Sequence, residues 1–241
     1  MGCCFKTDAY FVAFAGITVL AEIIGEGIST SLVPTLMKIE AKEGKMKKLE
    51  YINNILNMII LLSLGLIILN WILSPVVLKV LAKGFIEKEL YLSIELMKLG
   101  LPMILFILIR SVFVAFLQSN HGFKAGAKSW VYNNIVYIIY LLFFNKYGVY
   151  GLMVAGVLAS LSQLFSVIPA SINMGYKYEF KLNSKDVYFK EMIVLLIPII
   201  VALSVNRVNL LIDRSMASNL PKGSISYLNY ADNIVQLVLR I

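Results

Sequence analysis

The sequence has few charged residues and very few residues that bind metals or form disulfides. Only 15% of its 241 residues are charged, whereas about a quarter of the residues in a soluble domain are charged. The cysteines are the adjacent pair Cys3 and Cys4, and His121 is the single histidine. Adjacent cysteines supply neither a disulfide framework nor a zinc site. The composition therefore argues against a soluble domain, a disulfide-rich scaffold and a zinc protein.

The motifs of common catalytic sites are also missing. The sequence contains no Gly-rich phosphate loop that ends in Lys and Ser or Thr, no HExxH, and no nucleophile paired with a histidine. We therefore expect a protein that is not an enzyme and that holds no metal and no cofactor.

Long apolar runs dominate the sequence instead. Hydrophobic residues make up 59% of the chain, and the mean hydropathy is +0.81. A helix that crosses about 30 Å of hydrocarbon needs about 20 consecutive, mostly apolar residues, and stretches of this kind recur along the chain. The sequence predicts an all-α polytopic membrane protein with about seven transmembrane helices. The expected spans are residues 10–37, 52–82, 90–118, 128–145, 149–173, 190–216 and 224–241.

The lysines are distributed unevenly among the linkers between these spans. The segments "KIEAKEGKMKK", "HGFKAGAK" and "GYKYEFKLNSKDVYFK" hold five, two and four lysines, whereas the alternate segments "AKGFIEKE", "NKYG" and "NLPKG" hold two, one and one. Lysine and arginine accumulate in cytoplasmic loops. The first set is therefore expected in the cytoplasm, which places the N-terminus outside and the C-terminus inside. The net charge of +8 is then a topology signal and does not indicate a nucleic-acid partner.

The sequence looks cut at both ends. The last span, "ADNIVQLVLRI", stops without a turn or a polar tail. We interpret the chain as the middle of a longer protein, whose missing helices are supplied by the full-length chain or by a partner.

Five segments resemble one known family in their order along the chain. They are "TDAYFVAF" at 7–14, "GEGISTSLVPTL" at 25–36, "AKGF" at 82–85, "FLQSNHGFKAGAKSWVYNNIVYI" at 116–138 and "ASNLPKGSISYLNYAD" at 217–232. The family is that of the MurJ/MviN lipid II flippases, within the multidrug, oligosaccharidyl-lipid and polysaccharide exporter superfamily. The resemblance implies a two-lobed fold of fourteen helices, of which this chain supplies helices two to eight.

The resemblance also divides the chain and implies a function. Residues 1–175 form part of the N-terminal lobe with five transmembrane helices, residues 176–190 form a cytoplasmic linker, and residues 191–241 begin the C-terminal lobe with two helices. The implied protein lies in the bacterial cytoplasmic membrane among membrane lipids. It moves a polyprenyl-diphosphate-linked cell-wall precursor, lipid II, by alternating access, with the membrane potential or a monovalent cation as a possible energy source. The alternatives are another exporter of the superfamily, either a polysaccharide-repeat flippase or a cation-coupled drug exporter, and an inactive truncated remnant.

The segment "SVNRVNLLIDRSMASNL" at 204–220 carries an unusual polar load for a membrane helix. At 100° per residue its polar side chains fall within an arc of about 160°. One charge facing lipid near the bilayer centre costs about 2.5–3.5 kcal/mol. We therefore expect this arc to face a hydrated internal cavity, although the last two charges could instead lie at the headgroup level. The arc comprises Asn206, Arg207, Asn209, Asp213 and Arg214.

Two acidic residues of the first span, Glu22 and Glu26, lie four residues apart and share a face. They either line the cavity, as a proton or cation site, or pair with a Lys or Arg of a missing helix. Family members commonly carry arginines near Glu22 and at the position of Asn233, and these arginines contribute to a cationic cavity for the diphosphate. Arg110, Arg207 and Arg214 could replace part of that charge.

Other candidates for the cavity lining come from the family motifs. Asp8 matches the aspartate of "TDA", and it could equally cap the first span. Ser226 and Asp232 match the "S…YAD" pattern, and Asn233 and Gln236 follow on the same span. The remaining intramembrane amides, which include Asn133, Asn134 and Gln163, are interpreted as interhelical hydrogen-bonding groups.

Overall fold

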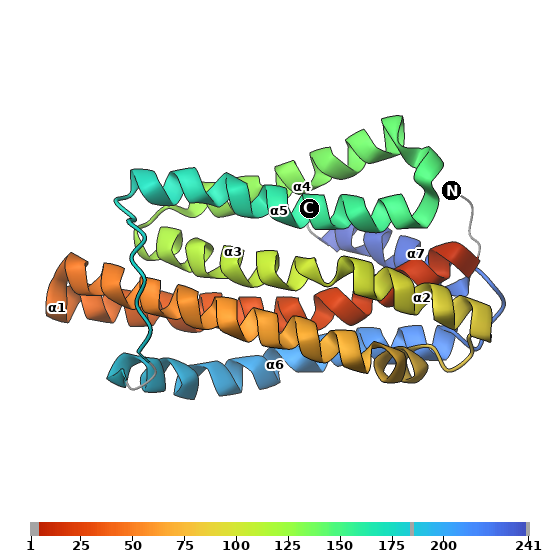
Figure 1. Ribbon diagram of the computed structural model, residues 1–241, viewed down its shortest axis with the longest axis horizontal. Helices are drawn as coiled ribbons and strands as arrows, with labels where there is room; N and C mark the ends of the chain where they lie inside the picture. The colour runs from red at the N-terminus through yellow and green to blue at the C-terminus, as the bar shows by residue number, and fades with distance from the viewer. Residues whose placement is uncertain (1–4, 184–185, 240–241) are drawn as a thin grey trace.

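The computed structural model describes residues 5–183 and 186–239, without the side chains of residues 206 and 236–239. Every regular element in the described residues is helical, which confirms the all-α fold class (Figure 1). The elements are α1 (Phe5–Leu81), α2 (Glu87–Gly100), α3 (Pro102–Ser119), α4 (Phe123–Phe143), the 3₁₀ helix η1 (Asn145–Tyr147), α5 (Gly148–Asn173), α6 (Val187–Ala217) and α7 (Ser224–Leu239).

The long element α1 consists of two antiparallel helices that meet at Gly44. The backbone of Gly44 has φ 85° and ψ 177°, a combination that is essentially restricted to glycine. The chain reverses there, so that Leu81 near the end of the second half packs against Gly16 in the first half (Figure 1). These halves correspond to the predicted spans 10–37 and 52–82.

The predicted span 90–118 is divided into α2 and α3. The boundary falls between Gly100 and Pro102, because proline has no N–H with which to continue the helical hydrogen bonding. Leu101 between them keeps helical dihedral angles, φ −52° and ψ −33°. A side chain at Gly100 would come within 2.5 Å of Ile17 and 2.7 Å of Met153, so this glycine permits the close packing of α2 on its neighbours.

Four helices of the described residues are long and apolar enough to cross a membrane: Phe5–Leu81, Pro102–Ser119, Asn145–Asn173 and Val187–Ala217. The first of these contains both halves of α1. The elements α2 and α7, with 14 and 16 residues, are shorter than a full crossing. The polytopic class is confirmed, although the seven predicted spans do not all appear as separate full-length helices.

The three lysine-rich linkers lie together at one end of the bundle (Figure 1). The buried ammonium group of Lys48, beside the α1 reversal, donates to the side-chain oxygen of Asn120 at 3.1 Å and to a carboxylate oxygen of Glu40 at 2.7 Å. The hydrogen bond from Lys48 lowers the pKa of the Glu40 carboxyl group. On the other side of the reversal, Lys38 pairs with Glu191 of α6 at 2.5 Å. The contacts therefore place the three linkers on one side, as the lysine pattern requires.

Between α5 and α6, residues 176–183 cross the bundle without regular secondary structure (Figure 1). This segment is held by three buried asparagines of α1, which are 1%, 3% and 5% exposed: Asn53, Asn54 and Asn57. The amide nitrogen of Asn53 donates to the Lys177 carbonyl at 2.9 Å, and its oxygen accepts from the Tyr176 hydroxyl at 2.7 Å.

The other two asparagines bind the segment in the same way. Asn54 donates to the Asn183 carbonyl at 2.9 Å and accepts from the Asn183 N–H at 2.6 Å. Asn57 donates to the Lys181 carbonyl at 2.8 Å and accepts from the Tyr178 hydroxyl at 2.9 Å. The linker segment (residues 176–183) is therefore attached to α1 before the chain enters α6. Helix α6 begins at Val187, inside the predicted linker 176–190, because the side chain of Asp186 caps it by accepting from the Tyr188 N–H at 2.8 Å.

We predict that Asn57→Ala will release the linker segment. The change removes the hydrogen bonds to the Lys181 carbonyl and the Tyr178 hydroxyl, each of which contributes about 0.5–1.5 kcal/mol to stability. Hydrogen exchange at residues 177–183 is expected to accelerate, and Tyr178→Phe is expected to have a smaller effect. Asn145→Ala, at the opposite end of the bundle, is the matched control. Unchanged exchange in Asn57→Ala would show that the asparagines do not hold the segment.

We predict that the lysine-rich end faces the cytoplasm. In a variant without Cys3 and Cys4, a cysteine introduced at Lys45 is expected to react with a membrane-impermeant maleimide only after the cells are permeabilised. A cysteine at Lys146, in the loop at the other end, is expected to react in intact cells. The reverse pattern of labelling would contradict the orientation.

Candidate functional site

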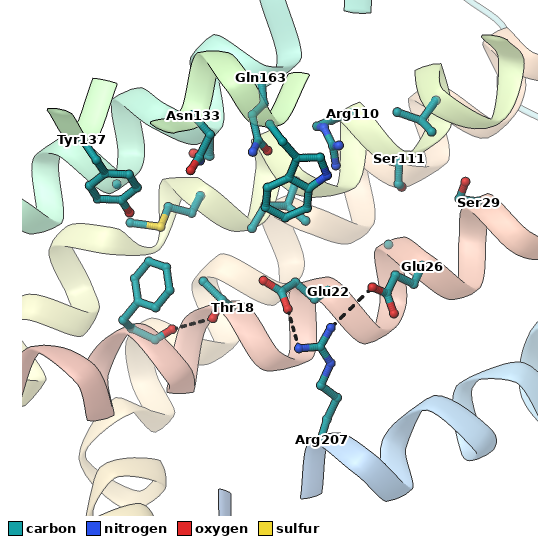
Figure 2. A pocket seen from close by; sticks show the side chains of 18 residues that line it. Thr18, Glu22, Glu26, Ser29, Arg110, Ser111, Asn133, Tyr137, Gln163 and Arg207 are labelled. Atoms are coloured by element: carbon teal, nitrogen blue, oxygen red, sulfur yellow. Dashed lines mark hydrogen bonds and ion pairs between the residues drawn. The ribbon is translucent and has the colours of Figure 1, made fainter. Parts of the chain in front are cut away.

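A cavity of about 540 Å³ lies among α1, α3, α4, α5 and α6 (Figure 2). Much of its lining is polar, and the charged groups come from three different helices. Figure 2 shows Glu22 and Glu26 of α1 on one side with Arg207 of α6, and Arg110 of α3 on the opposite side. The polar lining includes Thr18, Glu22, Glu26, Arg110, Asn133, Gln163 and Arg207.

Arg207 forms ion pairs with both acidic residues of α1. Its Nη1 lies 3.0 Å from a carboxylate oxygen of Glu22, and its Nη2 lies 3.4 Å from a carboxylate oxygen of Glu26. The two acids are one helical turn apart, so a single guanidinium group reaches both. The basic partner that the sequence left open for Glu22 and Glu26 is therefore present in this chain. The three formal charges, two negative and one positive, leave the cluster with a net charge of −1.

Arg110 has a different environment. Its Nε and Nη2 donate to the hydroxyl oxygen of Ser129 at 3.2 and 2.8 Å, and its guanidinium carbon lies 5.4 Å from the centre of the Trp130 ring. Ser129 is fully buried and donates in turn to the Gly126 carbonyl at 2.6 Å. The first turns of α4 therefore orient Arg110 through neutral groups.

Two of the intramembrane amides also line the cavity. Asn133 and Gln163 lie on the same side as Arg110 (Figure 2), and Gln163 is 5% exposed. Asn134, next to Asn133, is exposed outside the lining. The sequence predicted that these amides form hydrogen bonds between helices. Their place in the cavity lining is compatible with that role, and the role stays a prediction.

The other polar side chains of α6 that the structure describes lie outside the cavity lining. Arg214 donates to the Phe11 carbonyl at 3.1 Å and to the side-chain oxygen of Asn229 at 3.0 Å. Asn209 and Asp213 are exposed, and the side chain of Asn206 is outside the described residues. Among the described side chains of α6, Arg207 belongs to the lining of this cavity, and the polar arc as a single cavity face stays a prediction.

Asp8 is buried and caps the start of α7. Its Oδ2 accepts from the Gly223 N–H at 2.6 Å, and its Oδ1 accepts from the N–H and hydroxyl of Ser226 at 2.9 and 2.6 Å. The structure thus places this carboxylate at the N-terminus of a distant helix, where the helix dipole favours a negative charge, and not at the cap of its own span. Asp8 and Ser226 lie outside the central cavity lining.

The other candidates of α7 are at the surface of the described chain. Asp232 and Asn233 are exposed, and the side chain of Gln236 is outside the described residues. Two more contacts join the loops beside Asp8. The Gly84 N–H donates to the Ser218 hydroxyl at 3.1 Å, and Lys222 pairs with the buried Glu89 at 3.2 Å. The end of the bundle opposite the lysine-rich linkers therefore connects α1 and α2 to the α6–α7 turn.

Comparison with known proteins identifies the family. The sequence model of the family described as "Lipid II flippase MurJ" matches residues 1–241. The chain belongs to the lipid II flippase MurJ family. It is 28% identical over 241 residues to a "Probable lipid II flippase MurJ" of Buchnera aphidicola subsp. Schizaphis graminum, with 98% of this chain and 47% of that protein covered. It is 27% identical over 258 residues to the protein of the same name from Helicobacter pylori strain J99, with 98% and 55% covered.

A solved structure gives the same result for the fold. "Lipid II flippase MurJ, inward closed conformation" matches 98% of this chain and 49% of its own length, with a TM-score of 0.83 and 26% sequence identity. The chain spans about half the length of the relatives that it matches. It is a multi-pass protein of the bacterial cytoplasmic membrane, as the family resemblance of its motifs implied.

We predict that the Arg207 cluster behaves as one unit. Arg207→Gln leaves two carboxylates without a cation and is expected to lower stability by about 1–3 kcal/mol, less than for a fully buried pair because the three side chains are partly exposed. Combining it with Glu22→Gln and Glu26→Gln is expected to recover most of that loss. Thermal unfolding of the purified chain in detergent measures the stability of the single and the triple variant. A triple variant less stable than Arg207→Gln alone would contradict the ion pairs.

Proposed function

We propose that this chain forms part of a flippase that moves a polyprenyl-diphosphate-linked cell-wall precursor, lipid II, across the cytoplasmic membrane by alternating access. The observation that carries the proposal is the polar cavity between α1 and α6 in a chain that matches the family over its whole length. A polar headgroup can occupy such a cavity, because guanidinium, amide and hydroxyl groups replace the water that it loses.

The outer surface of the helices suits the lipid part of such a substrate. The second half of α1 exposes large apolar side chains, which include Leu61, Ile68, Trp71 and Ile72. These side chains favour contact with hydrocarbon, whereas the headgroup favours the cavity. In this proposal the polyprenyl chain therefore stays in the bilayer while the headgroup crosses.

Alternating access requires α6 to move relative to α1. The polar contacts that join the two helices at the cavity are ion pairs at 3.0 and 3.4 Å, and the partners in such pairs can be exchanged for water. We propose that the membrane potential or a monovalent cation gradient drives the cycle without a cofactor.

We predict that the chain will function within a complete flippase. In cells depleted of their own lipid II flippase, a chimera in which this chain replaces the matching segment of the Helicobacter pylori relative is expected to restore growth. Residues 1–241 alone are expected not to restore it, because the match covers about half of the relatives. Lipid II exposed on the outer face of the membrane provides the direct measurement.

The unmodified Helicobacter pylori relative is the control for this experiment, with protein amounts compared by immunoblot. A chimera present in equal amount that neither restores growth nor exposes lipid II would contradict the proposed function. Rescue by residues 1–241 alone would contradict the need for a longer chain and would indicate a dimer.

A further inference from the structure

The cavity contains two guanidinium groups, and their partners leave them unequally available to an anion. Both terminal nitrogens of Arg207 pair with carboxylates, at 3.0 Å for Glu22 and 3.4 Å for Glu26. A phosphate that approached Arg207 would have to displace these carboxylates, and it would be repelled by the net negative charge of the cluster. Arg207 in this arrangement is a poor anion site.

Arg110 keeps its charge unpaired. Its hydrogen-bond acceptor is the neutral hydroxyl of Ser129, and within the described residues it has no ion pair with a carboxylate. The edge formed by Nε and Nη2 faces Ser129, which leaves the N–H groups of Nη1 for another acceptor, since a guanidinium group carries five donors.

The supports of Arg110 hold it in a fixed orientation. Ser129 is locked by its own bond to the Gly126 carbonyl at 2.6 Å, and the Trp130 ring lies 5.4 Å from the guanidinium carbon. Stacking on an aromatic ring restrains the plane of the guanidinium group and keeps its positive charge. Arg110 is therefore oriented before any ligand arrives, which reduces the entropy lost on binding.

We propose that Arg110, held by Ser129 and Trp130, is the residue of this cavity that binds an anionic phosphate or diphosphate group, and that Arg207 instead links α6 to α1. The identity of the anion as a polyprenyl diphosphate rests on the proposed function. In this arrangement the negative charge of Glu22 and Glu26 opposes anion binding and weakens the site.

The sequence provides a direct optical probe of this site. The chain has two tryptophans, and Trp71 lies in the second half of α1, where it is 53% exposed. Trp71→Phe therefore leaves Trp130, beside Arg110, as the sole tryptophan. In an uncharged detergent, geranylgeranyl diphosphate is expected to change its fluorescence saturably, and geranylgeraniol, which lacks the diphosphate, is expected to have no effect.

Calorimetric titration with geranylgeranyl diphosphate then assigns the binding residue. Arg110→Gln is expected to raise the dissociation constant about tenfold or more, because a charge-assisted hydrogen bond is lost. The dissociation constant of Arg110→Lys is expected to lie between those of Arg110→Gln and the parent. The triple variant Arg207→Gln, Glu22→Gln and Glu26→Gln is expected to bind at least as tightly as the parent. Retained binding in Arg110→Gln, lost binding in the triple variant, or no binding by the parent would each overturn the proposal.

Two further comparisons separate this proposal from the proposed function. Inorganic pyrophosphate binding as tightly as the lipid diphosphate, with the same loss in Arg110→Gln, would support the role of Arg110 and contradict a lipid-linked substrate. Growth restored equally by the chimera with and without Arg110→Gln would support the flippase and contradict the role of Arg110.

Discussion

The ion pairs of Arg207 with Glu22 and Glu26 determine how α6 is placed on α1. A single unpaired charge near the middle of a bilayer costs about 2.5–3.5 kcal/mol, so pairing stabilises each of these three side chains. Arg207 lies opposite the two acids, at 3.0 and 3.4 Å, while apolar side chains of the same two helices pack together around Ile23. This contact forms one wall of the cavity, and the position of the wall sets which other side chains face inward.

The cavity is therefore divided into two chemically different sides. The α1–α6 side carries a paired cluster with a net negative charge, and the opposite side carries Arg110 with the neutral groups of α4 and α5. Members of the family commonly carry arginines near the positions of Glu22 and Asn233, and this chain has an acidic and a neutral residue there. In this chain the guanidinium group that lines the cavity and does not pair with a carboxylate of the described residues belongs to Arg110 of α3. Arg110 therefore has a larger part in the proposed binding than the sequence suggested.

Polar groups also attach α6 and α7 to the preceding helices at both ends of the bundle. At one end Asp8 caps α7, and at the other end Asn53, Asn54 and Asn57 hold the linker segment. In each case a side chain of α1 satisfies backbone groups that would otherwise lack partners, and leaving such groups unpaired is costly away from water. The flanking contacts leave the ion pairs at the cavity as the interaction most easily exchanged between α1 and α6.

The sequence by itself determined the class of the protein, the approximate positions of most helices and the set of linkers that share one end, but not the division of residues 90–118 into α2 and α3. Those features depend on composition and on runs of neighbouring residues, such as the apolar spans and the lysine-rich linkers. Only the tertiary structure decided the partners of Arg207, Asp8 and the three asparagines of α1, which lie 121 or more residues away along the chain. Helical periodicity places a side chain on a face of its own helix, but it contains no information about which distant helix covers that face. The difference between Arg207, which pairs with two carboxylates, and Arg110, which has no ion pair among the described residues, therefore arises only when α1, α3 and α6 pack together.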